Sequence, residues 1–111
     1  SHAVSTGDFI FVTGQLPTGA DDDPIPKSIE DQTHKVMANL KTVLAGCDSK
    51  LADVVSVRIF LTKFEEEYDR MNAVYETYFP ADRRPARTTV GVTALARGCR
   101  VEIDLIAKRG S

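Results

Sequence analysis

The sequence predicts one α+β domain in which a mixed β-sheet carries two helices on one face. Three observations indicate this class. Five short segments are rich in strand-forming residues, and two longer segments repeat apolar residues at helical spacing. The order along the chain is β-β-α-β-α-β-β, without repeats, low-complexity segments or linkers. We therefore expect a single domain over residues 1–111.

The chain opens with two strand-forming segments. Residues 3–6 predict a short strand, and a Gly-Asp turn follows at residues 7–8. Residues 9–13 form an apolar run bounded by glycines, which is typical of a strand buried on both faces. Residues 17–27 then predict an exposed loop. We interpret its acidic run, residues 21–23, as solvated, because a calcium loop spreads its ligands over about twelve residues.

Capping signals and apolar stripes predict the two helices. Ser28 begins a capping-box pattern, and Gly46 is a suitable C-terminal cap for the first helix. Residues 62–65 (Thr-Lys-Phe-Glu) form a full capping box for the second, which should run to about Phe79 and stop at Pro80. We interpret both stripes as core packing. They consist of Ile29, Val36, Met37, Leu40, Val43 and Leu44 in the first helix, and Phe64, Tyr68, Met71, Tyr75 and Tyr78 in the second.

Three further strands are predicted at residues 54–61, 88–92 and 100–107. Two helices cover only one face of such a sheet. Alternation nevertheless leaves apolar side chains on the other face, and an exposed apolar face of that size is typical of an interface between subunits. We therefore expect an oligomer. The apolar groups assigned to the uncovered face come from residues 9–13, Val54, Phe60 and Ile106, and the polar residues assigned to the same face are Ser56, Arg58, Glu102 and Asp104.

Composition and charge exclude several classes of protein. The net charge of −2 argues against a nucleic-acid-binding protein. The only dense basic run, Arg83-Arg84 with Arg87, is short. No apolar run approaches the roughly 20 residues that cross a membrane, and we find no secretory signal. Cys47 and Cys99 lack metal-ligand spacing, so we expect reduced thiols in the cytoplasm. His2 and His34 complete no triad or metal site, and no phosphate loop is present.

Three features could carry chemistry. Arg87 lies where a turn enters a strand, and arginine binds a carboxylate with two parallel N–H···O bonds; the alternative is a surface or ion-paired arginine. Glu102, or Asp104 two residues on and on the same strand face, could hold a water molecule; the alternative is a structural salt bridge, with Arg87 as one candidate partner. Thr13-Gly14 could present a hydroxyl and backbone N–H groups to a ligand, or simply end a strand.

These features and their neighbours resemble the reactive intermediate deaminase family, known as the RidA or YjgF family. The resemblance implies a chorismate-mutase-like fold and a homotrimer, with a barrel-like core, outer helices and clefts between subunits. It also implies hydrolysis of 2-imino or enamine acids, such as 2-iminopropanoate and 2-iminobutanoate, to 2-oxo acids and ammonia, without metal or organic cofactor. The matching stretches are residues 7–17, 32–33, 39–40, 53–55, 71–75, 85–88 and 101–104.

The resemblance further implies roles for individual residues. Arg87 matches the arginine that binds the substrate carboxylate, and Glu102 matches the glutamate that positions or activates water. Many members carry a cleft tyrosine that would fall just before Ser1; either it precedes this sequence or the chain lacks it. The residues expected to line the substrate site are Thr13, Gly14, Asn72 and Thr89.

Two other functions remain as alternatives. One is a non-catalytic or chaperone-like trimer that binds small carboxylates in the same cleft. The other is an RNA-cleaving translation inhibitor, against which the acidic charge balance and the lack of a basic, aromatic-lined groove both argue.

Overall fold

The computed structural model describes residues 1–20 and 23–110, and in these ranges it contains five strands and two long helices. Their order, β-β-α-β-α-β-β, confirms the predicted class. Residues 21 and 22 of the predicted acidic run lie outside the described residues. The elements are β1 Ala3–Thr6, β2 Phe9–Gln15, α1 Ile29–Gly46, β3 Val54–Leu61, α2 Phe64–Glu76, β4 Ala86–Gly91 and β5 Val101–Lys108, with short 3-10 turns at Leu51–Asp53, Ala81–Arg83 and Ala96–Gly98.

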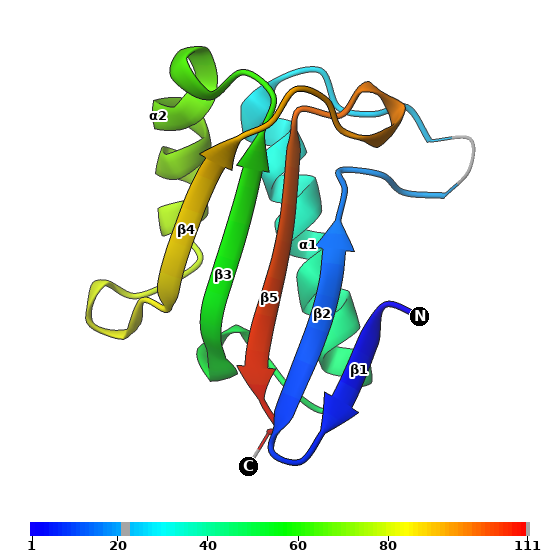
Figure 1. The fold of residues 1–111 in the computed structure, drawn as a ribbon, viewed down its shortest axis with the longest axis vertical. Helices are drawn as coiled ribbons and strands as arrows, with labels where there is room; N and C mark the ends of the chain where they lie inside the picture. Colours follow the sequence, from blue (N-terminus) through cyan, green and yellow to red (C-terminus); the bar gives the residue numbers. More distant parts are fainter. Residues whose placement is uncertain (21–22, 111) are drawn as a thin grey trace.

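The strands form one mixed sheet in the order β1-β2-β5-β3-β4. β3 and β4 are parallel, whereas the β1–β2, β2–β5 and β3–β5 pairs are antiparallel. Figure 1 shows both helices behind this sheet, which leaves its front face uncovered by any helix. The parallel pair arises because α2 carries the chain from the end of β3 back to the start of β4.

The core lies between the helices and the covered face of the sheet. Helical spacing on α1 and alternation on the strands direct apolar side chains into the same layer, as predicted. Val43, Phe64, Tyr68 and Tyr78 from the predicted stripes are only partly buried, at the margin of this layer. The fully buried large side chains include Ile10, Ile29, Met37, Leu40, Leu44, Ile59, Leu61, Met71 and Ile103.

The two predicted helix starts had different outcomes. Ser28 caps α1 as expected, because its side chain accepts a hydrogen bond of 3.0 Å from the backbone N–H of Asp31. The capping box predicted for residues 62–65 is wrong: Lys63 is the N-cap of α2 and makes no side-chain cap bond. The N–H of Thr62 donates to the carbonyl of Arg100 at 3.1 Å, so Thr62 continues the backbone pairing of the sheet. Thr62 therefore precedes the N-cap by one residue and does not cap the helix.

The end of α2 lies close to its predicted position. The regular helix stops at Glu76, but the next three residues stay coiled through backbone bonds to the residue three positions earlier. This tighter turn ends at Phe79, immediately before Pro80. The predicted end near Phe79 therefore matches the end of the helical turns, whereas the α-helix itself ends three residues earlier, at Glu76.

Two predictions about strand faces need correction. Phe9 and Phe11 are 42% and 44% exposed, so within one chain β2 is buried on one face only. Val54 was assigned to the uncovered face but is 7% exposed and belongs to the core. The pairing of β3 with β5 is irregular between Val54 and Ser56, and such a bulge reverses the alternation of the residues before it.

The uncovered face is hollowed and carries exposed apolar side chains, as predicted. Val4 and Val90 are 56% and 40% exposed on it, in addition to the two phenylalanines of β2. A shallow hollow of about 430 Å³ crosses β1, β2, β5 and β3. Within it Arg58 donates two hydrogen bonds to Asp104, at 3.0 and 2.6 Å.

Candidate functional site

The guanidinium of Arg87 is held by side chains of α2. Its Nη1 donates to Oδ1 of Asn72 at 2.5 Å, and its Nη2 donates to the hydroxyl of Tyr68 at 2.7 Å. The guanidinium carbon also lies 5.8 Å from the ring centre of Tyr68 and 5.0 Å from that of Tyr75. Two hydrogen bonds and two aromatic neighbours fix the plane of the guanidinium in advance of any ligand.

Strand pairing explains why Arg87 faces α2. β4 begins at Ala86, two residues before the predicted start, so Arg87 lies within the strand and pairs with Val57 of β3. Val57 is 1% exposed and points into the core, and paired residues of neighbouring strands project to the same side. Thr89, two residues further on, therefore also faces the helices.

A second row of polar contacts supports Asn72. Its amide nitrogen donates to Oε1 of Glu76 at 3.0 Å, and Oε2 of Glu76 pairs with Nη1 of Arg84 at 2.8 Å. Because the amide NH₂ faces Glu76, the amide oxygen is turned toward Arg87. The predicted site residues Asn72 and Arg87 are thus brought together. Asn72 was identified only through the family resemblance, and the contribution of Tyr68 was missed because its spacing matched a core stripe.

Glu102 lies on the opposite face of the sheet, in contact with β2. It pairs with Phe60, and its alternation with buried Val101 and Ile103 directs it to the uncovered face. Burial, and to a smaller extent the negative charge of Asp104, raise the pKa of the Glu102 carboxyl above its ordinary value. A carboxylate with a raised pKa is a better proton acceptor than an ordinary exposed one.

Gly14 is required by its closeness to Glu102. A β-carbon at position 14 would overlap Oε2 of Glu102 and would lie 2.7 Å from its carboxyl carbon. Thr13 precedes Gly14 on the same strand, is exposed, and donates from its hydroxyl to the carbonyl of His2 at 3.2 Å. The structure thus brings together three predicted residues, Thr13, Gly14 and Glu102.

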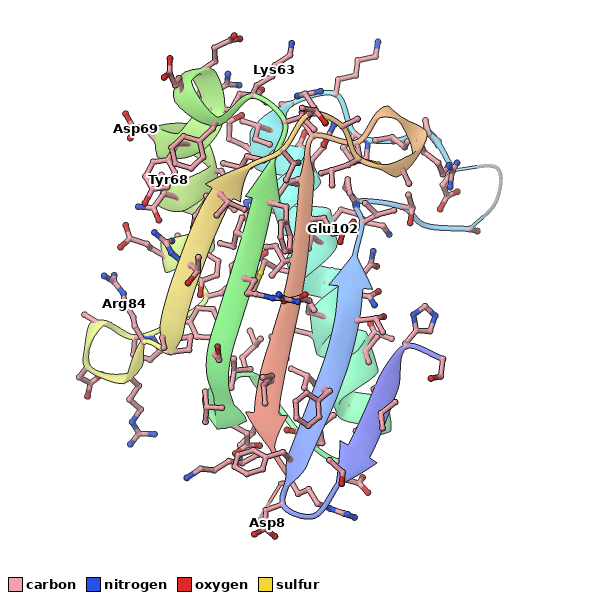
Figure 2. The ribbon with its side chains drawn as sticks, in the orientation of Figure 1. Asp8, Lys63, Tyr68, Asp69, Arg84 and Glu102 are labelled. Atoms are coloured by element: carbon pink, nitrogen blue, oxygen red, sulfur yellow. The ribbon has the colours of Figure 1, made fainter. Side chains whose placement is uncertain are left out.

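The two groups of predicted residues do not meet within one chain. Figure 2 shows Tyr68 on α2 beside β4, whereas Glu102 lies between β5 and β2. β3 separates β4 from β5, and the groups project from opposite faces. The alternative that Arg87 forms a structural salt bridge with Glu102 is therefore wrong for a single chain: Arg87 is bonded to Asn72 and Tyr68.

Asp104, the other carboxylate predicted as a water ligand, is already engaged. Both of its oxygens accept hydrogen bonds from Arg58. Glu102 forms no ion pair with any of the described residues, so of the two carboxylates it is the one left free to hold a water molecule. 

The remaining candidate groups are the cysteines and histidines, and they form no metal-ligand cluster in the part of the chain that the structure describes. Within those ranges no three His, Cys, Asp or Glu side chains are placed to hold a metal ion. Cys47 is partly buried and Cys99 is buried, and burial raises the pKa of the Cys99 thiol. His34 bonds through Nδ1 to the hydroxyl of Tyr78 at 2.6 Å. Among the described residues, no helix is sufficiently long and apolar to span a membrane.

The mixed sheet, with two helices on one face, is the chorismate-mutase-like fold of the YjgF type. The sequence model of the family described as "Endoribonuclease L-PSP" matches residues 1–109. A RutC family protein of Pyrococcus horikoshii is 37% identical over 108 residues, which cover 96% of this chain and 84% of the relative. The chain therefore belongs to the RidA/YjgF family.

Solved structures agree with this assignment. A YjgF family member from Neisseria meningitidis superposes with a TM-score of 0.88 at 30% identity, covering 99% of this chain and 87% of that one. TdcF of E. coli, solved with bound serine, superposes with a TM-score of 0.89 at 26% identity, covering 98% of this chain and 87% of that one.

Proposed function

We propose that this protein hydrolyses 2-imino acids to 2-oxo acids and ammonia, with Arg87 binding the substrate carboxylate. The observation that carries the proposal is the fixed guanidinium of Arg87. Arginine has five N–H donors. Asn72 and Tyr68 each take one, so three are left without a partner among the described residues. A fixed guanidinium with free donors is suited to bidentate recognition of a carboxylate.

The active site is composite in this proposal, with Arg87 from one subunit and Glu102 from its neighbour in a homotrimer. Two observations support this arrangement. Arg87 and Glu102 project from opposite faces of one sheet, and the face that carries Glu102 is apolar and uncovered. Packing this face against another subunit would bury the side chains of Phe9, Phe11 and Val90.

The reaction needs only positioning and proton transfer. Arg87 holds the carboxylate, and Glu102 accepts a proton from a water molecule that attacks the imine carbon. The C=N π electrons move to nitrogen and Glu102 passes the proton to it, which gives a carbinolamine with one hydroxyl and one amino group. Glu102 then takes the hydroxyl proton and passes it to the amino group, and the C–N bond breaks with its electron pair on nitrogen. Ammonia leaves, and the C–O bond becomes the carbonyl of the 2-oxo acid. Holding the reactants together in this geometry lowers the barrier because it removes the entropy loss of their encounter.

The variant Arg87→Lys tests the role of the guanidinium. Lysine keeps the positive charge but lacks the planar fork and cannot bond Asn72 and Tyr68 simultaneously in the same plane. We expect kcat/KM for 2-iminobutanoate, generated in situ by an amino-acid oxidase, to fall by about 100-fold, on the order of losing a charge-assisted hydrogen bond. Wild-type hydrolysis by this variant would exclude Arg87 as the carboxylate anchor.

A second candidate function is binding of small carboxylates without turnover. The serine bound to TdcF favours this possibility, because serine is a carboxylate that this chemistry leaves unchanged. The same oxidase-coupled assay separates the two functions. Tight binding of 2-oxobutanoate or serine, with imine decay no faster than in buffer, would favour binding alone and contradict the hydrolase proposal.

A further inference from the structure

The hydroxyl of Tyr75 is buried beside Arg87 without a hydrogen-bond partner. Tyr75 is 3% exposed, and its hydroxyl oxygen bonds to no group within residues 1–20 and 23–110. Leaving a buried hydroxyl unpaired destabilises a fold, and most buried polar groups in proteins are paired. The unpaired hydroxyl of Tyr75 is therefore a cost that a ligand could remove.

Packing explains the ring of Tyr75 but not its hydroxyl. The ring belongs to the core and lies 5.1 Å, centre to centre, from that of Phe79. A phenylalanine would make the same apolar contacts without burying an oxygen atom. The hydroxyl therefore has a role other than filling the core.

The surroundings of Tyr75 indicate what the hydroxyl would bind. Tyr75 lines a pocket of about 210 Å³ together with Glu76, Arg84, Pro85 and Arg87. Within this pocket, Glu76 is already engaged by Asn72 and Arg84. The guanidinium carbon of Arg87 lies 5.0 Å from the ring centre of Tyr75, so the phenol and the free donors of Arg87 belong to one small site.

A second unpaired hydroxyl lies near the same guanidinium. Oγ1 of Thr89 is buried and bonds to no group in the described ranges, and Thr89 follows Arg87 by two residues on the same side of β4. Two buried hydroxyls without a hydrogen-bond partner, those of Tyr75 and Thr89, therefore lie near the guanidinium of Arg87. Burial raises the pKa of Tyr75 to about 12, although the positive charges of Arg87 and Arg84 act in the opposite direction. The phenol thus remains a neutral hydrogen-bond donor at physiological pH.

We propose that Tyr75 is a further substrate-binding residue, whose hydroxyl donates a hydrogen bond to the carboxylate held by Arg87. The inference rests on the proposed function, because it adds a donor to the same carboxylate site. A carboxylate has two oxygens and about four acceptor positions, so it accepts from the arginine fork and from a phenol at the same time. A hydrogen bond to the ligand would give the Tyr75 hydroxyl the partner that it lacks in the free protein. The free energy of the liganded pocket would therefore be lower than that of the empty one.

The variant Tyr75→Phe isolates this hydroxyl. We would measure the Kd of 2-oxobutanoate, an unreactive carboxylate, by isothermal titration calorimetry, together with KM and kcat for 2-iminobutanoate, the melting temperature and the oligomeric state. We expect Kd and KM to rise by about ten- to a hundredfold, as for loss of a hydrogen bond to a charged group. kcat should change little, because this bond holds ground state and transition state alike. The melting temperature should stay the same or rise, because an unpaired buried hydroxyl is removed.

Tyr78→Phe is the matched control. It removes a tyrosine hydroxyl just beyond the same helix, but that hydroxyl is bonded to His34 and does not line the Arg87 pocket. Affinity for 2-oxobutanoate should therefore remain at the wild-type value in this variant. Equal losses in both variants would mean that helix stability, not ligand contact, governs affinity, and would overturn the proposal.

Other outcomes also decide the matter. Wild-type affinity in Tyr75→Phe would show that the hydroxyl does not contact the ligand, and a changed oligomeric state would indicate that it contributes to a subunit contact instead; either result overturns the inference. The absence of 2-oxobutanoate binding in the wild type would overturn it too. Weakened binding in Tyr75→Phe, in a protein that fails to hydrolyse imines, would refute the proposed hydrolase activity and leave the role of Tyr75 intact.

Discussion

Replacing Gly14 by alanine should displace the carboxylate of Glu102 without unfolding the protein. The new β-carbon would overlap Oε2 of Glu102, and it would lie 2.7 Å from the carboxyl carbon and 3.1 Å from Cγ. Carbon atoms in favourable contact are about 3.5 Å apart or more. The carboxyl group must therefore move by on the order of 1 Å, and a misplacement of that size in a catalytic group costs roughly 100-fold in rate.

The stability of this variant should change little. The atoms in the way are the end of a flexible, partly exposed side chain, and moving it off its preferred rotamer costs about 0.5–1.5 kcal/mol. Alanine also restricts the unfolded chain, which offsets about 0.4–1 kcal/mol of that cost. We expect the free energy of unfolding to change by about 1 kcal/mol or less, as measured by urea denaturation.

The assay compares imine hydrolysis by Gly14→Ala and by Gly46→Ala. A β-carbon at Gly46 has no heavy atom within 4 Å, so this control changes a glycine at the end of α1 without any contact to the site. We expect a roughly 100-fold loss of kcat/KM for Gly14→Ala and none for Gly46→Ala. The reasoning is refuted if Gly14→Ala folds and retains wild-type activity, since Glu102 would then not need its observed position.

Two further predictions concern pH and helix capping. Asp104→Asn removes the negative charge that helps to raise the pKa of Glu102, so this pKa should fall, though burial, the larger cause, will keep it above the ordinary value. Activity requires ionised Glu102 and rises with pH through its pKa; the acidic limb of the pH–rate profile should therefore move to lower pH, and an unmoved limb would exclude Glu102 as the titrating base. Ser28→Ala should reduce the free energy of unfolding by about 1 kcal/mol because it removes the cap of α1, whereas Thr62→Ala should lose no cap energy. Equal effects of the two substitutions in urea denaturation would contradict the observed caps.

The raised pKa of Glu102 also sets the sign of its effect on stability. In the folded protein Glu102 binds its proton more tightly than in the unfolded chain, so folding is favoured at low pH and this contribution is lost as pH rises through the folded pKa. The loss should be smaller in Asp104→Asn, where the folded pKa lies closer to the unfolded one. Comparing urea midpoints on both sides of this range measures the difference.

The sequence by itself determined the elements and their order, because these depend on local patterns. The helical stripe of α1, its cap at Ser28 and the alternation in β5 are each readable from neighbouring residues. Arg87 and Glu102 could be singled out as charged residues in strands, and the family resemblance added Asn72, Thr13, Gly14 and Thr89 as candidates.

Only the tertiary structure decided which candidates face each other. Pairing with β3 turns Arg87 toward α2, while alternation along β5 turns Glu102 to the opposite face; each direction depends on contacts with residues distant in sequence. The bulge that buries Val54 arises from pairing with β5, and no signal in residues 54–61 marks it. The same holds for Tyr75, whose helical spacing indicates core packing while its unpaired hydroxyl depends on what surrounds it in space. Side-chain direction and hydrogen-bond satisfaction are properties of the packed sheet and helices, and local sequence does not fix them.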